Sequence, residues 1–178
     1  MPNANKQFRK LIASRVKKTA SNKPSKKGET KRLMQLQVAE FIQQYPKVRS
    51  VYDSKHYKTA SNYLQAEELM HIVFCKWLSI YYPSVFFMHP KNESKAGWVE
   101  QARKKMMGVK SGVSDLLLMH EGKDCFWLEL KTPKGRIQPS QKEFIELQRT
   151  LGNKAEFAKT LNECVQYVEE WLETCKEE

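Results

Sequence analysis

Long hydrophobic runs are missing from this chain of 178 residues. Its longest apolar stretch, Ile80 to Met88, is too short and too interrupted to cross a lipid bilayer, and the first residues lack the apolar core of a secretory signal. The four cysteines show no paired short spacing, which argues against a zinc cluster or a disulfide framework. These absences predict a cytoplasmic protein with reduced thiols and no contact with membranes.

Acidic residues are nearly absent from residues 1–32. This segment holds eleven lysines and arginines against the single acid Glu29, and it carries +10 of the formal net charge of +11. Such a segment cannot bury enough apolar surface to fold alone, so we expect it to form a basic, flexible arm. A polycation of this kind binds nucleic-acid phosphates through counterion release, without reading the base sequence. The alternatives are a solvated tail and a localisation signal.

The rest of the chain alternates helix patterns with strand patterns. Residues 33–61 are expected to form a short amphipathic helix and an irregular extension, and residues 62–178 the folded domain. Within this domain the predicted helices are 62–82, 93–107, 140–151 and 161–175, and the predicted strands are 85–88, 116–119, 125–130 and 154–158. This order predicts an α/β protein with a mixed central β-sheet flanked by helices.

Residues 116–130 form the most informative segment of the chain. They contain two apolar runs separated by a polar, glycine-containing insert, a pattern typical of a β-hairpin. If Met119 pairs with Cys125, Asp115 falls opposite Glu129. Two carboxylates placed roughly 5 Å apart repel each other, and a bound cation would remove that repulsion.

The predicted hairpin places a basic residue beside the two acids. Strand side chains alternate with period 2, so Lys131 shares the face of Glu129 and Asp115. Two carboxylates and a main-chain carbonyl suit a hard cation such as Mg²⁺, and the lysine can orient or help to deprotonate an attacking water. The alternative is that Glu-Leu-Lys marks only a half-exposed strand, and that Gly112 and Asp115 only form the turn before the first strand.

The helix predicted at residues 62–82 contains two neighbouring acids that differ in orientation. At about 100° per residue, Glu67 lies on the flank of the apolar stripe, whereas Glu68 points away from it. A carboxylate at an apolar boundary is costly unless a metal ion or a lysine pairs with it. The alternative is a glutamate at the helix edge that turns outward to water.

Taken in order, these motifs resemble the VRR-NUC (virus-type replication-repair nuclease) branch of the PD-(D/E)XK nucleases. The matching positions are Glu67, His89 to Asn92, Met107 to Val113, Asp115, Glu129-Leu130-Lys131, Gly135 and Gln141. The resemblance implies a restriction-endonuclease-like core. The chain departs from the family pattern at Ser111 and Ser114, where the family often has proline, and at Lys91. Residues 1–61 are not covered by the motifs.

The resemblance also implies a role for each site residue. The implied ligands of a divalent metal, Mg²⁺ or Mn²⁺, are Glu67, Asp115, Glu129 and the carbonyl of Leu130. Lys131 would assist the attacking water, and Gln141 would support the site from the next helix.

By the same resemblance, we expect a metal-dependent DNA endonuclease that hydrolyses phosphodiester bonds in replication, recombination or repair. Members that stand alone, as this chain does, are similar to homodimeric enzymes that act on branched DNA, so a four-way (Holliday) junction is the expected substrate. Two alternatives remain open. One is a nucleic-acid-binding protein on a non-catalytic nuclease scaffold, and the other is a nuclease that cuts linear duplex DNA.

Overall fold

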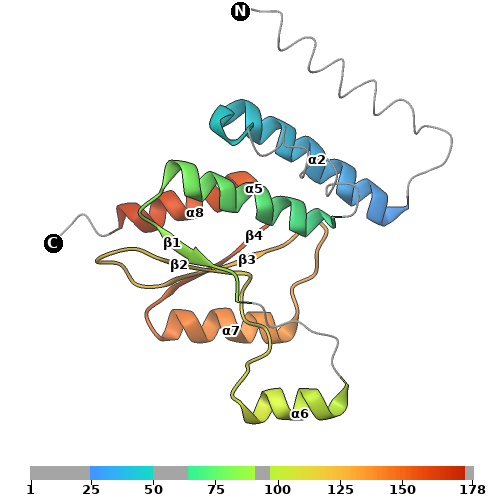
Figure 1. Cartoon of the computed structure of the whole chain (residues 1–178), viewed down its shortest axis with the longest axis vertical. Coiled ribbons are helices and arrows are strands. Elements are labelled where there is room, and N and C mark those ends of the chain that lie inside the picture. The colour runs from blue at the N-terminus through green and yellow to red at the C-terminus, as the bar shows by residue number, and fades with distance from the viewer. Residues whose placement is uncertain (1–24, 50–63, 91–96, 175–178) are drawn as a thin grey trace, which may run out of the picture.

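A computed structural model of the protein describes residues 25–49, 64–90 and 97–174 (Figure 1). Its centre is a four-stranded sheet with the spatial order β1-β2-β3-β4. The strands are β1 (Phe86–Met88), β2 (Leu116–Met119), β3 (Phe126–Leu130) and β4 (Lys154–Ala158). β1 pairs with β2, and β2 with β3, in antiparallel fashion, whereas β4 is parallel to β3. The predicted mixed sheet is therefore confirmed.

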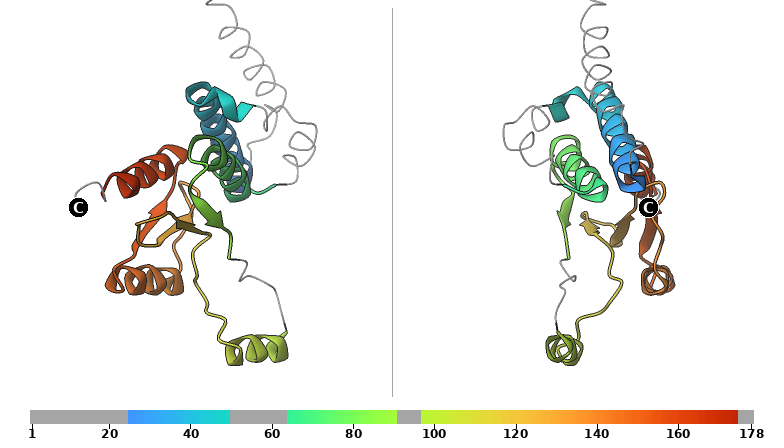
Figure 2. Two further views of the ribbon diagram at one scale, coloured as in Figure 1. Left: turned by 60° about the vertical axis from the view of Figure 1, so that its left-hand side comes forward. Right: turned by 90° about the vertical axis from the view of Figure 1, so that its right-hand side faces the viewer.

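Helices cover both faces of this sheet (Figures 1 and 2). They are α2 (Lys26–Gln44), α5 (Ala66–Tyr81), α6 (Trp98–Met106), α7 (Pro139–Thr150) and α8 (Leu161–Glu173), with a short 3₁₀ helix η1 (Pro46–Val48). α5 and α8 lie on one face and α7 on the other, while α2 packs on the outside of α5 and α8. α6 stands apart, on the connection between β1 and β2. None of the described helices is long and apolar enough to span a membrane.

The two faces of β3 carry different side chains, as the alternation predicts. Phe126 and Leu128 are fully buried in the core that the sheet shares with α2, α5 and α8. Trp127 points to the opposite face, where its ring meets Phe144 of α7 edge-on, with 5.0 Å between ring centroids. Glu129 shares this second face because it lies two residues further along the strand.

The first described helix begins earlier than the sequence predicts. α2 starts at Lys26, because the Ser25 hydroxyl caps it by accepting the N–H of Gly28 at 3.2 Å. Residues 26–32, which were expected to belong to the flexible arm, are therefore helical. The remainder of the expected arm, residues 1–24, lies outside the described residues.

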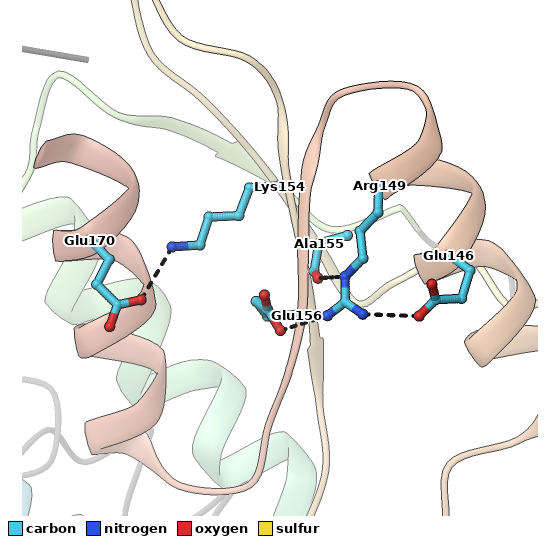
Figure 3. A network of polar contacts seen from close by, with 6 residues as sticks. All are labelled: Glu146, Arg149, Lys154, Ala155, Glu156 and Glu170. Carbon is cyan, nitrogen blue, oxygen red and sulfur yellow. Dashed lines mark hydrogen bonds and ion pairs between the residues drawn. The ribbon is translucent and has the colours of Figure 1, made fainter. Parts of the chain in front are cut away.

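A polar network ties α7 to β4 and β4 to α8 (Figure 3). Arg149 of α7 pairs with Glu146, one turn earlier, at 2.9 Å and with Glu156 of β4 at 2.8 Å. Lys154 of β4 pairs with Glu170 of α8 at 3.4 Å. These side chains are partly exposed, so each pair stabilises the fold only modestly. The pair of Arg149 with Glu156 holds the end of α7 beside β4, and the first turn of the same helix reaches the candidate active site.

Candidate active site

The hairpin of β2 and β3 has the predicted register. Leu116 pairs with Leu128, so the preceding residue, Asp115, lies opposite Glu129. The N–H of Leu130 donates a hydrogen bond to Asp115 Oδ2 at 2.8 Å, which fixes this carboxylate beside the end of β3. The structure thus brings the two predicted carboxylates to neighbouring positions.

Glu129 lies at the centre of a buried polar cluster. Its side chain is 1% exposed, and its Oε1 atom is bonded by Lys131 Nζ at 2.7 Å and by Gln141 Nε2. Gln141 Oε1 in turn accepts the N–H of Gln138 at 2.9 Å, which holds the amide in one orientation at the start of α7. Three of the predicted site residues are therefore in direct contact, although they come from β3, the residue after it, and α7.

Glu67 approaches the same strand end from α5. It is half-buried, and its Oε1 atom accepts the N–H of Thr132, the residue after Lys131, at 3.3 Å. Glu68 is exposed and caps α5 by accepting the N–H of Gln65 at 2.5 Å. The two acids therefore have the orientations that the helical period indicates.

These elements enclose a pocket of about 500 Å³. The predicted site residues on its wall are Glu67, Asp115, Leu130, Lys131 and Gln141. Glu129 is not on the wall, because it is buried and its carboxylate is engaged by Lys131 and Gln141.

Two histidines on the pocket wall were not predicted as site residues. His89 Nδ1 hydrogen-bonds to the carbonyl oxygen of Asp115 at 2.5 Å, and the ring of His71 meets the ring of His89 at right angles with centroids 4.7 Å apart. Burial, followed by the proximity of His89, lowers the pKa of His71 to about 4, so this imidazole is neutral at pH 7. The i, i+4 spacing of Glu67 and His71 on one helix was the available sequence signal.

Gly112 explains how the loop before β2 reaches α7. Its φ of +74° is in the left-handed region, and a Cβ atom at this position would overlap the carbonyl group of Ser140. Only glycine fits both conditions. This close approach holds the segment that leads to Asp115 against the first turn of α7, which carries Gln141.

Two titratable side chains of the cluster, Glu129 and Lys131, have shifted pKa values. Burial, and then the nearby Asp115 carboxylate, raise the pKa of Glu129 to about 7, although Lys131 opposes this shift. Burial alone would lower the pKa of Lys131, but its contacts with Glu129, and the charges of Glu67 and Asp115, raise that pKa above its ordinary value of 10.5. Lys131 is therefore protonated at neutral pH, whereas Glu129 is close to its titration midpoint.

The oxygen atoms of this cluster suit a hard divalent cation. Glu129 Oε2 is buried and has no hydrogen-bond partner among the described residues, so a positive charge beside it would offset the cost of its burial. Asp115 and Leu130 lie on the adjoining pocket wall. Within the described ranges, however, no three His, Cys, Asp or Glu side chains are arranged to hold a metal ion. The predicted ligand set of Glu67, Asp115 and Glu129 stays a prediction, and in this structure Glu67 Oε1 accepts the N–H of Thr132.

Residues 53–160 match the sequence model of the VRR-NUC domain. This range contains every predicted site residue, whereas α2 precedes it. A solved structure described as a VRR_NUC domain protein is 22% identical, with a TM-score of 0.48, and the similarity covers 60% of this chain and 87% of that one. No curated protein matches the sequence.

Proposed function

The chain belongs to the VRR-NUC family of PD-(D/E)XK-type nucleases, and from that premise we propose that it is a Mg²⁺- or Mn²⁺-dependent deoxyribonuclease that hydrolyses phosphodiester bonds in branched DNA. The observation that carries this proposal is the buried contact of Glu129 with Lys131 and Gln141, beside Asp115. Two neighbouring carboxylates, one of them buried, repel each other, and the single ammonium group of Lys131 offsets only one of the two negative charges. Such an arrangement is expected at a site that is kept for chemistry.

The proposed roles follow from the contacts of each side chain. Asp115, Glu129 and the carbonyl of Leu130 would hold the divalent cation, which supplies a Lewis acid for the phosphate and a bound water of lowered pKa. Contacts with Glu129 raise the pKa of Lys131, so in the metal-free protein this residue is protonated at neutral pH and can donate a hydrogen bond to the attacking water or to a phosphate oxygen. Gln141 keeps the Glu129 carboxylate in place through its amide group.

Incubation of labelled linear, flap and four-way-junction DNA with the protein tests this proposal. We expect cleavage of the branched substrates with Mg²⁺ and none with EDTA, because the charge on the transferring phosphate needs a cation to offset it. Binding without metal-dependent cleavage would support the non-catalytic scaffold instead. Equal rates on linear duplex and on junctions would support the third alternative, a nuclease for linear DNA.

We also propose that the enzyme acts as a homodimer, because two symmetric sites suit the symmetric strands of a four-way junction. An uncovered apolar surface supports this proposal. It consists of Phe86, Met88, Leu117 and Met119, which we call the apolar sheet patch. Phe86 lies opposite Met119, and Met88 opposite Leu117, across β1 and β2. Phe86, Met88 and Met119 are 56%, 44% and 39% exposed, because α7 covers only the other half of this sheet face.

A charged residue in the apolar sheet patch should therefore break the dimer. We expect the wild type to be dimeric and Met119→Glu to be monomeric, because a second copy would have to bury the new carboxylate. Light scattering coupled to gel filtration measures the mass of each protein. Leu151→Glu makes the same kind of change at a 64%-exposed position after α7, and it should stay dimeric. A monomeric wild type would contradict the proposed dimer.

A further inference from the structure

A second cavity adjoins the candidate active site. It has a volume of about 920 Å³ and lies between the first turns of α2 and the segments 64–67 and 132–134. We call it the α2 groove. Glu67 lines both this groove and the active-site pocket, and the consecutive residues Lys131 and Thr132 line one cavity each. A polymeric substrate that extends from the active site past Glu67 would therefore enter the α2 groove.

The outer wall of the groove lies outside the range that matches the VRR-NUC domain. α2 ends at Gln44, before the matched range of 53–160 begins. The helix is nevertheless fixed to the body of the protein, because Met34, Val38 and Phe41 are 0 to 1% exposed within the shared core. The first turns of α2 are thus held at a constant position beside the active site.

Lysines dominate the charge of the groove. Lys26, Lys27 and Lys31 come from α2, and Lys134 comes from the turn after β3. The acids on the same walls are Glu29, which pairs with Lys134 at 3.3 Å, and Glu67 at the boundary with the active site. Ammonium groups spaced along an open groove fit the repeating phosphates of a nucleic-acid strand and carry no base-specific information.

We infer that the α2 groove binds the sugar–phosphate backbone of the DNA next to the phosphate that is cleaved. This inference rests on the proposed nuclease function and assigns the path of the substrate beyond the catalytic pocket. The lysines of the groove contribute to DNA affinity and to the placement of the strand. They leave the hydrolysis step itself unchanged, because the described residues that line the groove do not include Asp115, Glu129 or Lys131.

The variant Lys27→Ala/Lys134→Ala removes one lysine from each wall and tests the inference. We expect about tenfold weaker binding of a labelled branched DNA in EDTA, and a slope of log Kd against log salt concentration that is smaller by about 2. With Mg²⁺, KM should rise by a similar factor and kcat should stay at the wild-type value. The charge-preserving variant Lys27→Arg/Lys134→Arg should bind as the wild type does.

The matched control is Lys47→Ala/Arg49→Ala, which removes two charges beyond the opposite end of α2. Unchanged affinity and salt slope in Lys27→Ala/Lys134→Ala, or an equal loss in the control, would overturn the inference even if the wild type cuts DNA. If the wild type binds DNA through these lysines but does not cut it, the inference about the groove stands and the proposed nuclease function is wrong. Deletion of residues 1–24 retains Ser25, the residue that caps α2, and the slope difference between the lysine variant and its parent should persist in that background.

Discussion

Asp115→Asn should lower the Mg²⁺-dependent cleavage of branched DNA by about 10³-fold. Asparagine has nearly the same size, and its side-chain oxygen can still accept the N–H of Leu130 that now bonds to Asp115 Oδ2. The substitution removes the negative charge beside Glu129, and with it the charge that a divalent cation requires. Single-turnover cleavage rates at saturating protein concentration measure this effect without interference from binding.

The control for this variant is Asp124→Asn, the same chemical change at an exposed position near the far end of the hairpin. It should cleave at the wild-type rate. Asp115→Asn should unfold at the same temperature as the wild type or a higher one, because the loss of the neighbouring charge relieves the repulsion of Glu129. Undiminished cleavage by a folded Asp115→Asn protein would place the metal ligands elsewhere.

The hairpin that carries these acids could be predicted because its determinants are local. The lengths of the two apolar runs within residues 116–130 favour one register, since a slip by one residue would turn every apolar side chain to the opposite face. That register places Asp115 opposite Glu129. Strand alternation then places Lys131 on the face of Glu129, where the ion pair is found.

Contacts between distant segments could not be predicted in this way. The bond from the Thr132 N–H to Glu67 joins residues 65 positions apart, and no local periodicity specifies such a partner. The contact between the rings of His71 and His89 likewise joins α5 to the residue after β1, and the sequence does not specify this partner. The start of α2 was misplaced because its first two turns have the composition of a solvated tail and bury no side chain, since the buried residues of this helix begin at Met34.

The titration of Glu129 should make the metal-free protein less stable as the pH rises. Burial, and then Asp115, raise the pKa of Glu129 in the folded protein to about 7 from its ordinary value of 4.5. The folded state therefore binds this proton more tightly than the unfolded state does. Stability is lost between about pH 4.5 and about pH 7 and stays lower above that range, by an amount on the order of 3 kcal/mol.

His71 titrates in an overlapping range with the opposite effect. Burial, and then His89, lower its pKa to about 4 from 6.5, so this residue makes the protein more stable as the pH rises from about 4 to 6.5. A pH series on the wild type alone would combine the two effects. A comparison with Glu129→Gln removes the contribution of His71, because both proteins contain this residue. In the wild type Lys131 stays protonated over this range, because Glu129 and the other nearby carboxylates raise its pKa above 10.5.

The free energy of unfolding of Glu129→Gln, relative to that of the wild type, should therefore rise by about 3 kcal/mol between pH 4.5 and pH 8. Glutamine has the same size as glutamate and stays neutral, and its amide oxygen can accept the bonds from Lys131 and Gln141. Urea unfolding in EDTA at about these two pH values measures the difference. Glu121→Gln, the same change in the exposed turn of the hairpin, should show no such rise.

Addition of Mg²⁺ at about pH 8 extends this test to the proposed metal site. A cation beside Glu129 Oε2 favours the charged carboxylate, so Mg²⁺ should stabilise the wild type and have little effect on Glu129→Gln. A stability difference that does not change with pH would contradict the raised pKa. In that case Glu129 would keep its ordinary pKa in the folded protein, and the ammonium group of Lys131 would be sufficient to compensate for its buried charge.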